Sequence, residues 1–137
     1  MQTRFYNILL LLNLFSFISG CSSIVFFSAV YGTHNKKHSK GYVEEGFASF
    51  YSNDFVGLKT ASGEVFNPED LTAAHRSIPF GTLVKVTNLK NGRQIVVKVN
   101  DRGPFVEGRI IDLTRRAAEL LDVKNQGVTM VRIEIVE

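Results

Sequence analysis

Residues 94–105 read QIVVKVNDRGPF, and this stretch decides which kind of fold the sequence predicts. Apolar residues recur at Ile95, Val97 and Val99, an alternation that is typical of a half-buried β-strand. Gly103 and Pro104 follow directly and end the strand, because proline lacks the backbone N–H that a strand donates to its neighbour. The stretch therefore predicts a strand that stops at a rigid turn.

Asp101 lies at the end of this predicted strand. By strict alternation its side chain continues the apolar face of Val97 and Val99, so we expect it at the mouth of the core and partly shielded from water. Partial burial favours the protonated form of a carboxylic acid, which a general acid needs. Taken alone, the segment also allows a turn aspartate that bonds only to its own backbone.

Other segments show the same short, strand-like character. Asn91-Gly92 predicts a two-residue hairpin with a type I′ turn, and Asn67-Pro68 predicts the start of a short turn. Thr114 is a suitable cap for a helix that runs through Leu121. Together these signals predict a small closed or nearly closed β-barrel. The further predicted strands are residues 46–51, 82–88 and 130–136.

The N-terminal segment predicts a secretory signal over residues 1–20. Arg4 precedes an apolar run, and no charged residue occurs from Phe5 to Thr33. An aliphatic residue and two small ones then precede Cys21, the only cysteine of the chain, in a pattern that resembles the lipobox of bacterial lipoproteins. We therefore expect lipidation at Cys21. An uncleaved membrane helix is the alternative, because the apolar run continues past this cysteine.

Residues 21–45 are expected to form a lipidated tether to a domain over residues 46–137. Ser22 and Ser23 after the cysteine favour the outer membrane, by resemblance to enterobacterial sorting rules, with the domain in the periplasm. His34 and His38 have the spacing of metal ligands on a helix, but neither a helix signal nor an acidic third ligand accompanies them. We expect a solvated linker there and no metal.

Composition narrows the classes of function. The 137 residues are 45% hydrophobic, which suits a single small core. The net charge is only +3 and includes no basic cluster, so binding to nucleic acid is not expected. No metal-ligand cluster, phosphate-binding glycine loop or nucleophile triad is evident, and no cofactor is implied.

An ordered series of motifs from Gly46 to the C-terminus resembles the rare lipoprotein A family. The series covers nearly the whole expected domain. Its members are GFASFY (46–51), KTASGE (59–64), LTAAH (71–75), IPFGT (78–82), VTNL (86–89), NGR (91–93), VNDRGPF (99–105) and RIIDL (109–113).

The resemblance implies a mainly β fold, a six-stranded double-psi β-barrel with one or two short helices. It also implies a lytic transglycosylase, which cleaves the MurNAc–GlcNAc β-1,4 bond of peptidoglycan without water and leaves 1,6-anhydro-MurNAc ends. The family's functional residues fall on Glu64, His75 and Asp101. We expect Asp101 to be the acid and then the base, with Tyr51 and Arg102 binding substrate.

Several assignments stay open at this point. Glu64 is expected to orient substrate or stabilise positive charge, and His75 to bind a carboxylate or sugar hydroxyl or else to hold a loop. Asp112 is expected to be structural and to brace the entry of the following helix. Because the distance between Glu64 and Asp101 is unknown, hydrolysis is not excluded.

Two functions without catalysis compete with the enzyme. One is an expansin-like lipoprotein that binds peptidoglycan, and the other is a tether between membrane and wall. Many members of the family continue into a C-terminal repeat domain that binds stripped peptidoglycan at the septum. This sequence ends with its last predicted strand, so septal targeting and a preference for peptide-stripped glycans are not expected from it.

Overall fold

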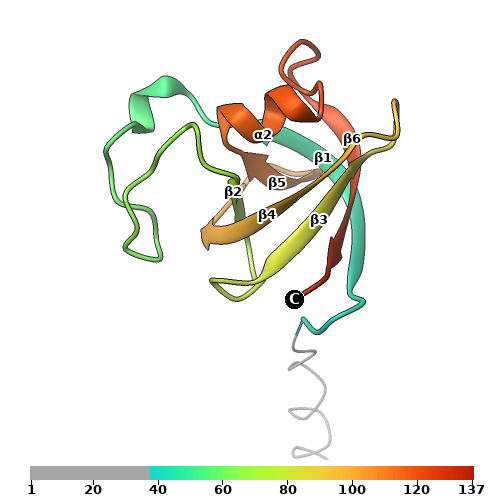
Figure 1. Ribbon diagram of the computed structural model, residues 1–137, viewed down its shortest axis with the longest axis horizontal. Helices are drawn as coiled ribbons and strands as arrows, with labels where there is room; N and C mark the ends of the chain where they lie inside the picture. Colours follow the sequence, from blue (N-terminus) through green and yellow to red (C-terminus); the bar gives the residue numbers. More distant parts are fainter. Residues whose placement is uncertain (1–37) are drawn as a thin grey trace, which may run out of the picture. The chain divides into compact units, whose positions relative to one another are not determined.

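The computed structural model describes residues 38–137, which contain six strands, one short α-helix and one 3-10 turn (Figure 1). No helix within these residues is long and apolar enough to cross a membrane. The predicted signal segment, Cys21 and His34 lie outside the described residues. The elements are β1 (Val43–Phe50), η1 (Asn53–Phe55), β2 (Thr72–His75), β3 (Leu83–Asn88), β4 (Gln94–Asp101), β5 (Arg109–Leu113), α2 (Arg115–Leu120) and β6 (Thr129–Ile135).

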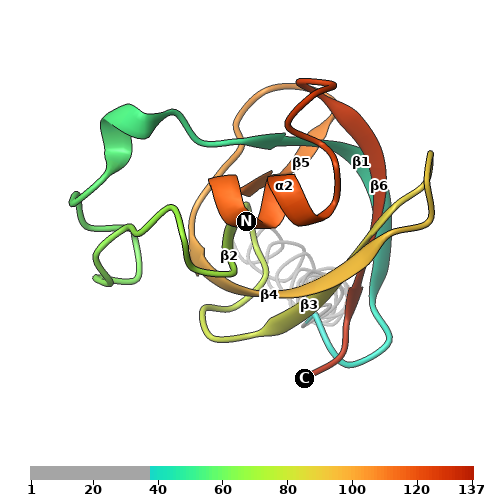
Figure 2. The same cartoon turned by 45° about the horizontal axis from the view of Figure 1, so that its top comes forward.

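The six strands close into a barrel in the order β1-β5-β2-β4-β3-β6, with β6 paired back to β1 (Figures 1 and 2). Two pairs, β1 with β5 and β2 with β4, are parallel. The other four pairs are antiparallel. Because the barrel is closed, no strand is left with a free hydrogen-bonding edge. The predicted six-stranded barrel is confirmed.

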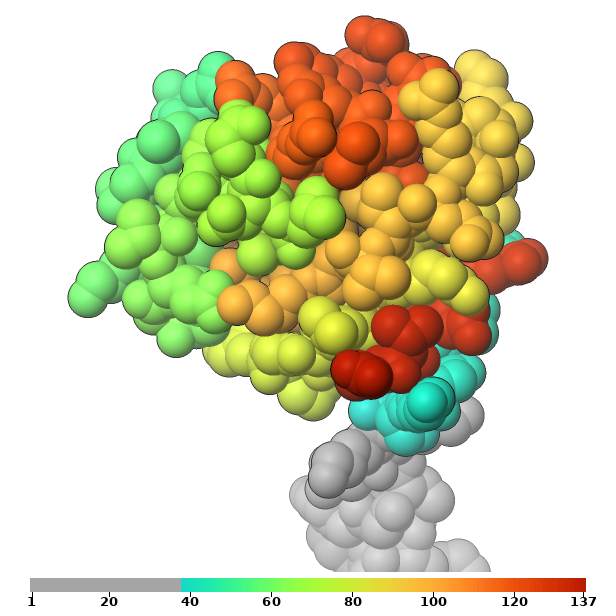
Figure 3. Space-filling view, in the orientation of Figure 1, coloured from blue at the N-terminus to red at the C-terminus, as the bar shows by residue number. Residues whose placement is uncertain are grey.

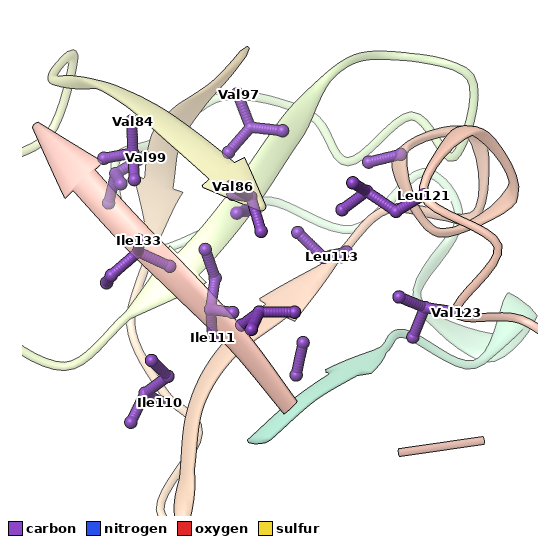
Figure 4. Close-up of a cluster of buried hydrophobic side chains, with 14 of the residues drawn as sticks. Val84, Val86, Val97, Val99, Ile110, Ile111, Leu113, Leu121, Val123 and Ile133 are labelled. Carbon is purple, nitrogen blue, oxygen red and sulfur yellow. The ribbon is translucent and has the colours of Figure 1, made fainter. Parts of the chain in front are cut away.

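Branched aliphatic side chains fill the barrel (Figure 4). The inward positions of β3 and β4 alternate as predicted, with Val84, Val86, Val97 and Val99 at most 1% exposed. Helix α2 lies across one end of the barrel, and its buried residues Ala117 and Ala118 join the same core (Figure 2). The valines of β3 and β4 are β-branched, and such residues suit the pleated, enclosed surface of a barrel wall.

The predicted helix after Thr114 is confirmed. The Thr114 hydroxyl accepts a hydrogen bond from the backbone N–H of Ala117, as an N-cap residue does, and donates one to the carbonyl of Asp70. The second bond joins the start of the helix to the long loop between β1 and β2. Residues 51–71 of that loop form a lobe beside the barrel, green in Figures 1 and 3.

The barrel begins earlier than the predicted boundary at Gly46. Strand β1 starts at Val43, and Tyr42 packs against the core. His38, expected in a solvated linker, is partly buried, and its Nε2 lies 2.7 Å from the Ser77 hydroxyl. The charged residues before Gly46 concealed the strand. Glu45 lies on the outer side of the sheet, where it pairs with Arg132 of β6, whereas Glu44 is half-buried beside His75.

The hairpin between β3 and β4 is present, but the predicted type I′ turn is wrong. Thr87 pairs with Gln94, and a longer loop joins the strands. Only Gly92 has a positive φ, +76°, whereas a type I′ turn needs positive values at both central residues. The Asn91 side chain instead reaches across to the Leu121 carbonyl at 3.2 Å. The loop is thus bonded to the residue that ends α2.

Strands β2 and β5 do not show the alternation that revealed the others. All four residues of β2 are buried, and β5 has buried neighbours at Ile110 and Ile111. In β2 both faces are buried, and in β5 a register shift against β1 places the two buried isoleucines next to each other. Continuous burial removes the period of two that marks a half-exposed strand.

Gly46 offers a test of how closely β1 and β5 pack. A Cβ atom at this position would lie 2.5 Å from Cγ2 of Ile110 and 3.2 Å from the carbonyl oxygen of Gly108. We expect Gly46→Ala to lower the free energy of unfolding by about 1–3 kcal/mol, because β5 must shift to admit the methyl group. Urea denaturation checks this. Gly41→Ala is no control, because Gly41 has a positive φ; Ser39→Ala is suitable and should change little.

Candidate active site

A cleft of about 350 Å³ opens on the outer side of the barrel wall. Its lining comes from the end of β1, from the turn that follows β4, and from β5. Two stretches that lie far apart in the sequence, residues 50–55 and 101–112, therefore meet there, because β1 and β5 are neighbours in the barrel. The lining includes the aromatic and charged residues Tyr51, Phe55, Asp101, Phe105, Arg109 and Asp112.

Asp101 lies in this cleft and is half-buried. Its Oδ1 accepts hydrogen bonds from the backbone N–H groups of Ala61 and Arg102, both at 2.8 Å. Its Oδ2 accepts one from the Tyr51 hydroxyl at 2.7 Å. Two fixed backbone donors occupy Oδ1, so Oδ2 is the oxygen that can exchange a proton with a ligand.

The predicted direction of the Asp101 side chain, on the same face as Val97 and Val99, is wrong. The pairing of β2 with β4 shifts register, so that Ala73 opposes Val99 but Ala74 opposes Asp101. Asn100 is thus the extra residue of a bulge. Ala73 faces the core, and its neighbour Ala74 faces the other side. Asp101 therefore points to the outer side, into the cleft, instead of continuing the face of Val99.

Tyr51 was predicted to bind substrate, and the structure places it in the cleft as a partner of Asp101. Its ring packs against Phe66, with the centroids 4.8 Å apart. Burial, followed by the hydrogen bond to Asp101, raises the pKa of Tyr51 well above its ordinary value. The phenol therefore stays protonated and remains a hydrogen-bond donor to Oδ2.

Glu64 is hydrogen-bonded to Asn100, the residue before Asp101, but it does not line the cleft. Its carboxylate accepts hydrogen bonds from Lys98 at 2.8 Å and from Asn100 at 3.0 Å. These bonds, that from Lys98 first, hold the pKa of Glu64 below its usual value. Glu64 is thus an ionised, exposed carboxylate whose two oxygens both have partners, and it is poorly suited to donate a proton.

His75 is not in the cleft either. Its side chain is buried, and Nδ1 accepts hydrogen bonds from the N–H groups of Ser77 and Ile78 at 3.2 and 3.1 Å. The proton therefore resides on Nε2, which lies 3.1 Å from the Glu44 carboxylate. Burial lowers the pKa of His75 despite this carboxylate, so the ring is neutral. Such a ring shapes the loop after β2 and has no free nitrogen to offer a sugar.

Arg102 lines the cleft, but much of its guanidinium is already engaged. Nη1 donates to the carbonyls of His75 and Ile78 at 3.2 and 2.9 Å, and the group lies 3.7 Å from the centroid of the Phe80 ring. These bonds anchor the turn that carries Asp101 to the loop that His75 shapes. Arg102 therefore joins His75 to Asp101 through the backbone.

Asp112, expected to brace the helix, lies in the cleft instead. It accepts hydrogen bonds from the Ser49 hydroxyl and from Arg109, both at 2.5 Å. It has no hydrogen bond to α2, which Thr114 caps. The sequence offered one hint of a strand here, because Asp112 follows two isoleucines, which are buried. Nothing in the segment, however, indicates that β5 runs beside β2.

The aromatic residues near the motifs have different surroundings. Phe50 packs against the core, and Phe80 lies beneath the Arg102 guanidinium. Phe105 is 81% exposed and lines the cleft, as does Phe55 at 47%. Phe105 is therefore the ring most available for a ligand, a choice that the sequence did not allow.

A family model described as lytic transglycolase matches residues 43–133, nearly the whole barrel. The chain belongs to the lytic transglycolase family. Its closed six-stranded barrel is the double-psi β-barrel that the motifs predicted. The match spans all the strands that build the cleft.

Proteins named endolytic peptidoglycan transglycosylase RlpA are among the relatives of this chain. The one from Pasteurella multocida is 49% identical over 107 residues, which cover 78% of this chain and 36% of that protein. The one from Rickettsia felis is 50% identical and covers 75% and 47%. A probable RlpA from Nostoc is 58% identical and covers 66% and 25%. The chain thus spans less than half the length of each of these relatives.

Solved structures share the fold at lower identity. A Streptomyces papain inhibitor aligns with a TM-score of 0.58 at 24% identity, over 72% of this chain and 97% of its own. An expansin from Clavibacter michiganensis aligns with a TM-score of 0.55 at 24% identity, over 70% and 51%. A double-psi barrel thus occurs in proteins with different names, so function must be argued from the cleft.

Proposed function

We propose that this lytic transglycolase cleaves the MurNAc–GlcNAc β-1,4 bond of peptidoglycan and forms 1,6-anhydro-MurNAc ends. The observation that carries the proposal is Asp101, a carboxylate in an open cleft with one oxygen anchored by two backbone donors and the other bonded to the Tyr51 hydroxyl alone. Relatives named peptidoglycan transglycosylases support the choice of substrate.

The reaction needs one group that donates and then accepts a proton. Protonated Oδ2 of Asp101 gives its proton to the glycosidic oxygen as the bond to the anomeric carbon breaks. The C6 hydroxyl then bonds to that carbon, and its proton returns to Oδ2. No water is consumed, and Asp101 ends in its starting form. A single carboxylate is enough for this cycle, in contrast to the carboxylate pair of most glycosidases.

Tyr51 would then position Oδ2 and stabilise the carboxylate after it has given up its proton. Tyr51→Phe should lower kcat by about 10- to 100-fold, because hydrogen bonds to charged groups are worth about 1.5–3 kcal/mol. Without this donor the ionised form is less stable, so the pH profile of kcat should move to higher pH. Rates measured from pH 4 to 8 check the shift. An unchanged profile would remove Tyr51 from the proton-transfer step.

Phe105 is proposed to stack against a sugar ring. Its phenyl group is exposed on the turn that follows Asp101, and a sugar presents apolar C–H groups to such a face. Phe105→Ala should raise KM about 5- to 20-fold and leave the stability unchanged. Product formation over a range of glycan concentrations checks it, with Val128→Ala as a control at an exposed residue outside the cleft. Equal effects of the two variants would contradict stacking.

Mass spectrometry of digested peptidoglycan tests the activity itself. Wild-type protein should release fragments with 1,6-anhydro ends, 18 Da lighter than hydrolysis products, and Asp101→Asn should not. Fragments with free reducing ends would instead indicate hydrolysis, and no fragments at all would contradict both reactions. Intact and peptide-stripped glycans, compared in parallel, would define the substrate preference.

A wall-binding protein without catalysis is the second candidate. It is favoured by the shared fold with an expansin, one form of which was solved in complex with cellohexaose. Sedimentation with insoluble peptidoglycan separates the two. Wild-type protein that sediments but yields no fragments would establish the binding role. Asp101→Asn protein that sediments and has lost cleavage would establish the enzyme.

The protein is further proposed to be anchored in the bacterial envelope by lipid on Cys21, in the outer membrane and facing the periplasm. The lipobox-like pattern before that cysteine supports this. Metabolic labelling with a clickable palmitate analogue tests it, because Cys21→Ser should lose the label and leave the membrane fraction. Retention of Cys21→Ser in the membrane would favour the uncleaved helix.

A further inference from the structure

Asp112 shares the cleft with Asp101 and is held in a comparable way. Its Oδ1 accepts both hydrogen bonds, one from Ser49 and one from Nη2 of Arg109. Its Oδ2 has no hydrogen-bond partner among residues 38–137, and the side chain is only 16% exposed. The carboxylate is therefore fixed through one oxygen, and the other is available to a ligand in the cleft.

The strand register places the two carboxylates on the same side of the barrel wall. Ala74 of β2 pairs with Asp101 of β4 on one side and with Asp112 of β5 on the other. Residues that pair across neighbouring strands point to the same face. The backbones of the two aspartates are separated by two strand spacings, about 9–10 Å. Both aspartates line the same cleft, so a ligand bound there lies near the two carboxylates.

Asp112 is better placed than Glu64 to act on positive charge in the cleft. Both oxygens of Glu64 are occupied by Lys98 and Asn100, and its side chain is 46% exposed and lies outside the lining. Asp112 lines the cleft, is more buried and keeps one oxygen free. A charge acts more strongly where water is partly excluded.

We propose that Asp112 is a second catalytic carboxylate, which stabilises the positive charge that develops at the anomeric carbon while Asp101 transfers the proton. The inference rests on the proposed transglycosylase function and assigns to Asp112 the role that the motifs alone suggested for Glu64. No bond to Asp112 forms or breaks. Arg109 and Ser49 act as positioning residues, since both hold Oδ1.

Steady-state formation of anhydro products by three variants tests this. Asp112→Asn removes the charge and keeps an oxygen for Ser49. It should lower kcat by about 100- to 1000-fold, as loss of one electrostatic stabiliser does, with KM changed less than about threefold. Its pH profile should keep the wild-type shape, because Asp112 takes no part in the proton transfer. Glu64→Gln, which removes an equivalent charge outside the cleft, should lower kcat far less.

Arg109→Gln is the matched control for structural damage. It breaks the same ion pair as Asp112→Asn but leaves the carboxylate in place, and it should lower kcat by no more than about tenfold. Equal losses in the two variants, or wild-type kcat in Asp112→Asn, would overturn the inference and leave the proposed function standing. If wild-type protein forms no anhydro product, the proposed function fails and the role of Asp112 fails with it.

Discussion

Asp101→Asn is expected to lower the rate of anhydro-product formation by about 10²- to 10⁴-fold, the range that general acid–base groups contribute. Asparagine can still accept hydrogen bonds from Ala61 and Arg102 through its oxygen, so the geometry of the turn should survive. What it lacks is a proton to give to the glycosidic oxygen. The loss should therefore appear in kcat, with binding to peptidoglycan retained.

The measurement is product formation by mass spectrometry under single-turnover conditions, with thermal unfolding recorded for the same preparation. The wild-type rate should depend on pH. The residual rate of Asp101→Asn should lose the part of this pH dependence that comes from the Asp101 carboxyl group. Asp54→Asn is a suitable control, since Asp54 is an exposed carboxylate bonded only to Ser52. Undiminished products from Asp101→Asn would end the proposed mechanism.

His75→Ala is expected to lower the free energy of unfolding by about 2–5 kcal/mol. It leaves the N–H groups of Ser77 and Ile78 without their acceptor, and the unpaired group at the buried Ile78 costs about 1–3 kcal/mol, to which the lost packing of the buried ring adds. It also removes a partner of Glu44. Because the same loop holds Arg102 beside Asp101, activity should fall as a consequence of the structural loss.

The pH dependence of stability gives an independent signature of His75. Its pKa is lower in the folded protein than the ordinary value of about 6.5, so the unfolded chain binds more protons below that pH. The contribution of the neutral ring is therefore complete above about pH 6.5 and is lost as the pH falls toward the folded pKa. His75→Ala should flatten this part of the stability profile.

Guanidinium denaturation between pH 5 and 8 measures both effects. His38→Ala is the control, because His38 touches the same ring edge-on but holds only the Ser77 side chain, and it should cost less than about 1 kcal/mol. A His75→Ala protein that is inactive yet as stable as wild type would instead make His75 part of the chemistry.

Local patterns in the sequence determined the elements whose environment alternates. Strands β3, β4 and β6 each have one face toward the core and one toward water, so their residues repeat with a period of two. The cap at Thr114 is equally local, because its partner is three residues away. The motif series also brought Asp101 and Tyr51 forward as site residues, and the structure joins them by a hydrogen bond.

Only the tertiary structure decided which charged residues share the cleft. The register shift opposite Ala74 turns Asp101 outward, and the pairing of β5 with β1 and β2 brings Asp112 beside it. The same packing draws His75 inward and leaves Glu64 outside. Strand order and register depend on contacts between segments far apart in the chain, which no local periodicity records. A sequence motif can therefore identify a candidate carboxylate, but the pairing of strands in the barrel determines which face of the wall that carboxylate lies on.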